Sequence, residues 1–140
     1  MGATRWVLVF GLAVGAPGAA GAQAVGAPTS PPFEVDIRPM LQTVEQEVRD
    51  YTSQTLTVEA WRALTQRDHA RAEAYAKLCI WLYAEEAQAQ QHALTAFAPN
   101  DRVHDSWALN DVATCYFILG ESLRLRRRLP EAAAMFERVV

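Results

Sequence analysis

The sequence predicts an all-α protein in which antiparallel helical hairpins follow a leader segment. Six of the seven Gly and five of the seven Pro lie within the first 39 residues, so the rest of the chain has few turn formers. The same remainder holds 17 of the 25 Ala, the residue with the highest helix propensity. With 140 residues, 51% of them hydrophobic, and a net charge of −3, the chain has room for one main domain. These values exclude a long disordered protein and a basic nucleic-acid binder.

Residues 1–22 have the three parts of a secretory signal peptide. Arg5 adds a positive charge near the amino terminus, and residues 6–14 form an uncharged apolar run. Ala20 and Ala22 then stand three and one positions before the expected cleavage point. A membrane anchor is the alternative, but a span needs about 20 apolar residues, and Gly and Pro interrupt the chain soon after this run. We therefore expect a periplasmic or secreted protein.

After cleavage, residues 23–35 are expected to form a short flexible tether, because Pro31 and Pro32 favour an extended, polyproline-like run. Loss of Arg5 leaves 12 basic and 16 acidic residues, a net charge of −4. This charge argues against nucleic acid or anionic lipid as a partner. No stable membrane insertion is expected once the leader is removed, and residues 36–140 then form the helical domain.

The first two helices of this domain are predicted over 36–55 and from Thr57 to about residue 65. Asp36 is a favourable N-cap, and Pro39 falls in the first turn, where its missing N–H costs nothing. Apolar residues then recur at three- and four-residue steps, which is typical of an amphipathic helix. Thr57 is expected to cap the second helix, and residues 66–68 are predicted to form a tight turn.

Three further helices are predicted. The third covers 69–94 and ends before Pro99, which disfavours helix at the residue preceding it. The fourth begins at Asp105 or Ser106 and runs to about residue 127. Pro130 suits the first turn of a fifth helix. The third helix has a stripe of mostly small residues for close packing: Ala72, Ala76, Cys79, Tyr83, Ala87 and Gln90.

Residues 113–140 resemble a tetratricopeptide repeat (TPR), a helical hairpin of 34 residues with apolar residues at fixed positions. Gly120 is the single Gly of the helical domain, and the resemblance explains it by a close crossing of two helices that a Cβ would hold apart. The residues that match the first helix of the repeat are Tyr116, Leu119, Gly120 and Leu123, and those that match the turn and second helix are Leu129, Ala132, Phe136 and Val139.

Residues 57–94 resemble a degenerate copy of the same hairpin, since the turn and second helix fit the pattern and the first helix fits it poorly. The resemblance implies a short TPR-like solenoid of about five helices. The last helix of 113–140 is then cut short and lacks a polar cap, so either the chain is a fragment or its open end meets a partner. The residues that fit in the earlier hairpin are Asp68, Ala72, Ala76 and Cys79.

The hairpin of the form W-x-x-L-x-x-x-D, followed by SWALNDVATCYFILGE, also resembles exported bacterial TPR proteins, some of which carry a beta-glucanase precursor label. The resemblance implies a protein–protein interaction or scaffold module of the bacterial envelope. The alternative is a non-catalytic module of, or a fragment associated with, a beta-glucanase-like carbohydrate-active enzyme. A jelly-roll glucanase itself needs many strands and clustered carboxylates, and the sequence offers neither.

Resemblance to the repeat assigns Phe117, Glu121 and Arg124 to its concave, ligand-binding face. Their spacing of four and three residues places them together on one side of a helix. The arginines that follow are predicted to lie in a solvated turn, because positive charges are favourable near a helix C-terminus. The alternative is that they form a patch for an acidic partner. This patch consists of Arg126, Arg127 and Arg128.

The side chains with catalytic or metal-binding chemistry form no recognisable site. His69 and Glu73 stand four apart on one helix face, but no third metal ligand is placed with them, so a solvated surface is expected. Glu85 and Glu86 are adjacent and point in different directions on a helix. We therefore predict no enzyme activity, no metal site and no cofactor. The tryptophans of the helical domain are expected to pack between helices rather than to bind sugar: Trp61, Trp81 and Trp107.

The two cysteines, Cys79 and Cys115, are predicted to form a disulfide in an oxidising compartment. In stacked repeats the segments that carry them are neighbours. The alternative is two buried free thiols that act as small hydrophobic side chains, since packed helix axes lie farther apart than the Cα atoms of a disulfide can.

Overall fold

The computed structural model describes residues 36–44, 50–96 and 100–139, and all regular structure in these ranges is helical, which confirms the predicted all-α class. The leader 1–22 and the tether 23–35 lie outside the described residues. Among the described helices, none is both long and apolar enough to cross a membrane. The elements are α1 (Ile37–Val44), α2 (Ser53–Thr65), α3 (His69–Ala93), the 3-10 helix η1 (Asn100–Ser106), α4 (Trp107–Leu125) and α5 (Leu129–Phe136).

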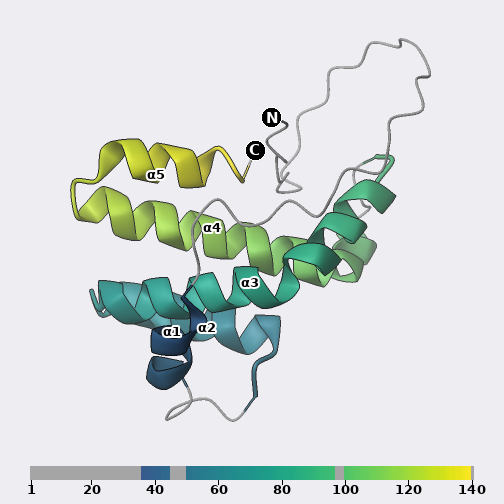
Figure 1. The fold of residues 1–140 in the computed structure, drawn as a ribbon. Coiled ribbons are helices and arrows are strands. Elements are labelled where there is room, and N and C mark those ends of the chain that lie inside the picture. The colour runs from purple at the N-terminus through teal and green to yellow at the C-terminus, as the bar shows by residue number, and fades with distance from the viewer. Residues whose placement is uncertain (1–35, 45–49, 97–99, 140) are drawn as a thin grey trace.

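The helices form two antiparallel hairpins, α2–α3 and α4–α5, which pack through α3 and α4 (Figure 1). The contact between α3 and α4 is the most extensive one in the described chain. Helix α4 also packs against α2, α5 covers only α4, and α1 lies against α3. Since α2 and α4 both run antiparallel to α3, these two first helices of the hairpins are parallel to one another.

Both hairpins turn in the same way. In the first, the N–H of Asp68 donates to the carbonyl of Ala63 at 2.9 Å, and Arg67 has a φ of 61°. In the second, the N–H of Arg128 donates to the carbonyl of Leu123 at 2.9 Å, and Arg127 has a φ of 62°. This is the Schellman arrangement, which satisfies the last carbonyl groups of a helix. The two turns lie 60 positions apart in the sequence.

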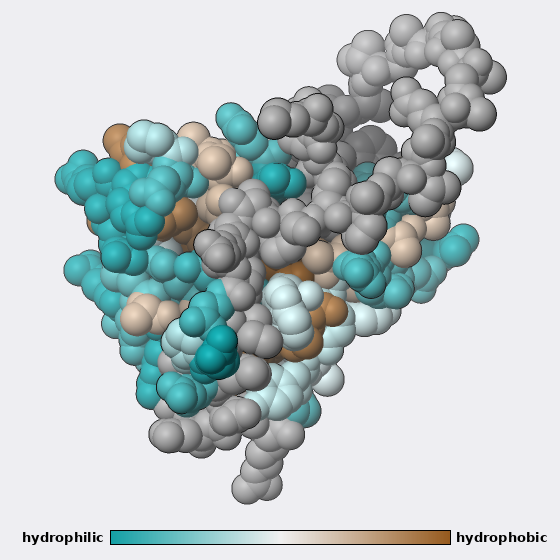
Figure 2. Space-filling view, in the orientation of Figure 1, coloured by the Kyte–Doolittle hydropathy of each residue, from teal (hydrophilic) through white to brown (hydrophobic). Residues whose placement is uncertain are grey.

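The core lies where α2, α3 and α4 meet, and it is built from small and aliphatic side chains with two buried tyrosines. Figure 2 shows that hydrophilic side chains predominate on the described part of the visible face, where apolar ones are confined to small areas. The largest fully buried side chains are Tyr75, Tyr116, Leu56, Leu78, Ile80, Leu109, Ile118, Leu119, Val44 and Val112.

The predicted boundary between the first two helices is wrong. Residues 50–52 are not helical, and α2 begins four residues before the expected cap, Thr57. Asp50 accepts hydrogen bonds from the N–H of Thr52 at 3.3 Å and from its Oγ1 at 3.1 Å, and such local bonds compete with helix. Thr52 is the actual N-cap, because its side chain accepts from the N–H of Thr55. Thr57 is buried inside α2.

The predictions for the later helices agree with the structure within two residues. Helix α3 ends at Ala93, α4 ends at Leu125, and α5 begins at Leu129 with Pro130 in its first turn. The tryptophans are more exposed than expected, with exposed fractions of 39%, 45% and 46% for Trp61, Trp81 and Trp107. The rings of Trp61 and Trp107 nevertheless contact Phe117 and Tyr83 on neighbouring helices. Small side chains such as Ala60 and Ala72 are fully buried where the helices pack.

The contact that requires a glycine at position 120 differs from the expected one, which was a close crossing of two helices. A Cβ built at Gly120 would lie 2.6 Å from Cδ1 and 2.8 Å from Cζ of the Phe136 ring. The atom that approaches the α4 backbone therefore belongs to an aromatic side chain of α5, and the missing Cβ makes room for this ring.

Candidate binding surface

Helices α2 and α4 run side by side and form an exposed surface, which we call the α2–α4 face and define by Val58, Trp61, Phe117, Glu121 and Arg124. The hydroxyl of Ser53 donates to Oδ2 of Asp111 at 2.5 Å and joins the beginnings of the two helices. Near their middles, the rings of Trp61 and Phe117 lie 6.0 Å apart. The exposed fractions of Val58 and Phe117 are 48% and 36%, so the face presents apolar side chains to solvent.

Phe117 is the central aromatic residue of this face. Its ring centroid lies 6.0 Å from that of Trp61 on α2 and 5.7 Å from that of Phe136 on α5, with tilts of 42° and 53°. The three rings form a row across three helices, and such tilted pairs are favourable aromatic contacts. Phe117, which the sequence assigned to the concave face away from the packing residues, is thus partly exposed and partly packed against two other rings.

Glu121 and Arg124, the other two predicted ligand residues, bind one another. Nε of Arg124 donates to Oε1 of Glu121 at 3.0 Å, and Nη2 donates to Oε2 at 2.8 Å. The hydrogen bond from Arg124 lowers the pKa of the Glu121 carboxyl below its ordinary value. A ligand that approaches Phe117 therefore meets a closed ion pair one turn further along α4, and a charged ligand has to compete with it.

The run of three arginines is divided among different partners. Nη1 of Arg126 donates to Oε1 of Glu73 on α3 at 2.6 Å, and Nε of Arg128 donates to Oε1 of Glu131 on α5 at 2.7 Å. Arg127 lies between them in the turn and is exposed. Two of the three charges are thus compensated within the domain, which weakens the patch as a docking site for an acidic partner.

His69 and Glu73, the possible metal pair, instead connect α3 to α4 through a buried hydroxyl. Oγ of Ser122 donates to Oε1 of Glu73 at 3.0 Å and lies 3.2 Å from Nδ1 of His69. Because Ser122 gives its single proton to Glu73, it accepts one from Nδ1 of His69. Within the described residues, no group of three His, Cys, Asp or Glu side chains is arranged to hold a metal ion.

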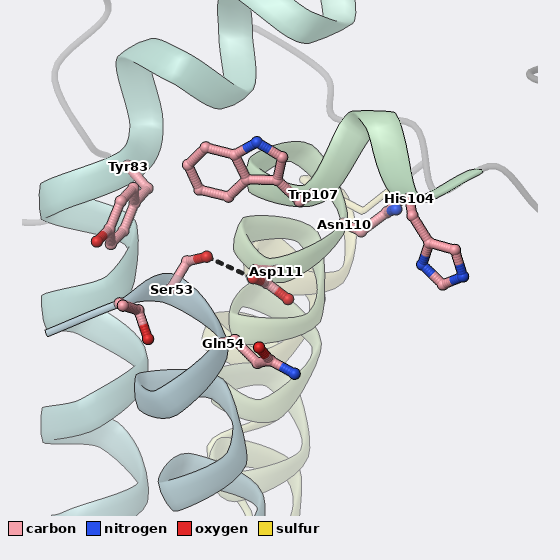
Figure 3. A pocket seen from close by; sticks show the side chains of 8 residues that line it. Ser53, Gln54, Tyr83, His104, Trp107, Asn110 and Asp111 are labelled. Carbon is pink, nitrogen blue, oxygen red and sulfur yellow. Dashed lines mark hydrogen bonds between the residues drawn. The ribbon is translucent and has the colours of Figure 1, made fainter. Parts of the chain in front are cut away.

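A pocket of about 470 Å³ opens where α2 and α4 begin, at one end of the α2–α4 face (Figure 3). The rings of Trp107 and Tyr83 meet at 78° with centroids 5.8 Å apart, and the hydroxyl of Tyr83 donates to the carbonyl of Tyr51 at 2.7 Å. The sequence did not point to this pocket. Its lining residues are Thr52, Ser53, Gln54, Tyr83, His104, Trp107, Asn110 and Asp111.

Asp111 is the single carboxylate in the lining of this pocket, and no Lys or Arg lines it. Partial burial raises the pKa of the Asp111 carboxyl above its ordinary value, and the hydrogen bond from Ser53 opposes this effect. Within the described part of the chain, Asp111 forms no ion pair. The pocket therefore contains a partly desolvated negative charge beside two aromatic rings.

The two cysteines are free and fully buried in the structure. Their sulfur atoms lie 3.8 Å (Cys79) and 3.4 Å (Cys115) from Oγ1 of Thr57, so α2, α3 and α4 bring both thiols to one hydroxyl. Burial and the neighbouring Cys79 thiol raise the pKa of the Cys115 thiol well above its ordinary value. The two cysteines are thus neighbours, as predicted, and the disulfide itself stays a prediction.

A search of protein-family models, of curated proteins and of solved structures finds no match to this chain. The assignment of a function therefore depends on the geometry described above.

Proposed function

We propose that this chain is an exported TPR-type interaction module that binds a protein or peptide along the α2–α4 face. The observation that carries this proposal is the pair of parallel first helices with Val58, Trp61 and Phe117 exposed on their shared side. Exposed aromatic side chains at the centre of a rigid helical surface are typical binding hot spots. A groove between helices accommodates an extended segment or a short helix of a partner.

The repeat character of the domain is supported by the equivalence of its two hairpins. At an offset of 60 positions, the turn residues Arg67 and Arg127 share a positive φ, and the small residues Ala60 and Gly120 share the same place in α2 and α4. Ala72 and Ala132 are equally buried in the second helices of the hairpins. Two hairpins with the same turn and the same small contacts are what stacking of a repeated unit requires.

Export to the periplasm or the medium is part of the proposal and depends on residues 1–22 of the sequence.

A non-enzymatic role is favoured by the hydroxyl of Ser122, the one serine that contacts both a His and a carboxylate in the described chain. This hydroxyl is fully buried, so it lacks the access that a nucleophile needs, and it donates to Glu73 rather than to the imidazole of His69.

A second candidate function, a non-catalytic carbohydrate-binding module, is favoured by Trp107. Its indole is 46% exposed and shares a pocket with the amide side chains of Gln54 and Asn110. An aromatic ring beside planar polar groups is suited to the apolar face and the hydroxyl groups of a sugar. A soluble β-glucan oligosaccharide titrated against the protein tests this candidate directly, through a saturable change in tryptophan fluorescence.

The proposed function is tested by selecting peptides that bind the purified protein from a random peptide library. Trp61→Ala should weaken binding of the selected peptides by about 30-fold, the loss of a hot-spot residue. The matched control is Trp81→Ala, which removes an indole of similar exposure from α3, a helix that contributes no residue to the α2–α4 face.

A second matched pair uses charge instead of truncation. Val58→Glu places a carboxylate on the α2–α4 face, whereas Leu82→Glu places one on an exposed position of α3. Val58→Glu should abolish peptide binding, and Leu82→Glu should leave it unchanged. Equal effects of the two members of either pair, with all four variants folded by circular dichroism, would reject the α2–α4 face as the ligand site.

A further inference from the structure

We infer that the pocket at the beginning of α2 and α4 binds a basic side chain, Lys or Arg, of the peptide ligand, with Asp111 as its counter-ion and Trp107 as its wall. The inference rests on the proposed function for its peptide and names the chemistry that this peptide must carry. It assigns a role to pocket residues that are not among those that define the α2–α4 face.

The charge of the pocket selects a cation. Asp111 is a partly buried carboxylate whose described contact is the hydroxyl of Ser53, and a hydroxyl does not neutralise it. A buried charge without a counter-ion is costly, so a cationic ligand gains the interaction that the domain itself does not provide. The net charge of −4 after loss of the leader also favours the approach of a basic partner.

The aromatic walls favour a cation as well. Trp107 and Tyr83 meet nearly at a right angle and form two sides of the pocket, and Figure 3 shows the indole above the hydrogen bond between Ser53 and Asp111. Tryptophan is the strongest partner in cation–π contacts. A basic side chain that enters beside Trp107 can therefore contact the ring and reach the carboxylate at the same time.

The amino-terminal ends of α2 and α4 lie at this same pocket, and helix N-termini favour anions. Asp111 is itself an anion in the second turn of α4, and Thr52 already accepts a hydrogen bond from the beginning of α2. The donors that would attract a phosphate or carboxylate are thus partly engaged, and no Lys or Arg lines the pocket to assist them. His104 is the one lining residue that can become a cation, and Figure 3 shows its imidazole pointing away from Asp111.

The position of the pocket also predicts the spacing of the ligand. Ser53 and Trp61 are eight residues apart on α2, which corresponds to about 12 Å along the helix. An extended peptide covers this distance with about three or four residues. The ligand should therefore have a Lys or Arg three or four positions from an aromatic or large aliphatic residue that packs on Trp61 and Phe117.

The experiment follows amide NMR shifts of the purified protein during titration with Nα-acetyl-lysine methylamide. Its neutral analogue, Nα-acetyl-norleucine methylamide, has the same shape without the charge. The lysine probe should shift the amides of Ser53, Trp107 and Asp111 and bind about tenfold more tightly than the neutral probe. Asp111→Asn should remove this preference, while Asp105→Asn should keep it, because Asp105 pairs with Arg102 on η1 and does not line the pocket.

Several results would overturn the inference. These are equal binding of the charged and neutral probes, no binding of the lysine probe to the wild-type protein, and an unchanged preference in Asp111→Asn. Binding of inorganic phosphate or of a β-glucan oligosaccharide in the pocket, in place of the lysine probe, would also overturn it. Peptides that bind Trp61 without any basic residue would reject this inference alone. Lysine binding without any selected peptide would instead reject the proposed function.

Discussion

Replacement of Gly120 by Ala tests how the second hairpin is packed. The new Cβ would lie 2.6 Å and 2.8 Å from two carbons of the Phe136 ring, against an optimal carbon–carbon separation of about 3.5–4.0 Å. The ring also contacts Phe117, with centroids 5.7 Å apart, so it cannot move away without loss of that contact. Gly120→Ala therefore forces a shift of the ring or of α5.

Two opposing effects determine the size of the change. Ala in place of Gly within a helix stabilises the folded state by about 0.5–1 kcal/mol. Insertion of a methyl group into an occupied space costs about 1–3 kcal/mol. The cost exceeds the gain, so Gly120→Ala should lower the free energy of unfolding by about 1 kcal/mol. In a Phe136→Ala background the ring is gone, and Gly120→Ala should then raise the free energy of unfolding by about 0.5–1 kcal/mol.

The assay is urea unfolding of the four proteins of this double-mutant cycle, followed by circular dichroism at 222 nm. Equal m-values are required, since only then does a change in midpoint report stability. The sign of the Gly120→Ala effect should reverse between the two backgrounds, with a coupling energy of about 2 kcal/mol. If Gly120→Ala stabilises both backgrounds equally, the Phe136 ring does not press on Gly120, and the packing described for α4 and α5 is wrong.

Three further predictions concern export, the cysteines and the pocket carboxylate. Amino-terminal sequencing of the exported protein should show cleavage near Ala22, with Gln23 or Val25 as the first residue, and an intact Met1 would refute cleavage. The exported chain, unfolded without reductant, should show no free thiol and should run as a monomer on a non-reducing gel; two titratable thiols would mean that Cys79 and Cys115 stay unbonded. Because burial raises the pKa of Asp111, its contribution to stability is present below the unfolded pKa of about 3.9 and is lost as the pH rises through the folded pKa. The stability of Asp111→Asn relative to wild type should therefore increase in urea unfolding as the pH rises above the unfolded pKa of about 3.9, and a pH-independent difference would refute this assignment.

Local signals explain which helices the sequence predicted well. Asp68 caps α3 by accepting a hydrogen bond from the N–H of Arg71 at 3.1 Å, and Pro130 lies in the first turn of α5, as expected. The boundary before α2 was wrong because a repeating apolar pattern continues through residues 50–52 although Asp50 binds the backbone of Thr52. Periodicity reports which residues face the core, and it does not report where a polar side chain replaces a helical hydrogen bond.

The spacing of Phe117, Glu121 and Arg124 placed them on one side of a helix, but it did not predict the ring contacts of Phe117 with α2 and α5. The pocket was missed, because its lining comes from four elements that are separated by up to 59 positions in the sequence. One local signal was available: Trp107 and Asp111 stand four apart and therefore share one side of α4 at its beginning. This spacing alone does not predict a pocket. The pocket also needs Tyr83, and it is the packing of α3 on α4 that brings Tyr83 next to the indole of Trp107.

The elements between the two hairpin turns account for their separation of 60 positions. Helix α3 has 25 residues and α2 has 13, so α3 extends beyond the beginning of α2 by several turns. Ser106 makes no side-chain capping bond to α4, and it is Oε1 of Gln90, in the extension of α3, that accepts the N–H of Leu109 at 3.0 Å. The extension thus caps α4 from outside and carries Tyr83 to the pocket. The offset of 60 positions between the two turns comes from the length of α3 together with residues 94–106, which include η1, and the extension of α3 also places Tyr83 beside Trp107.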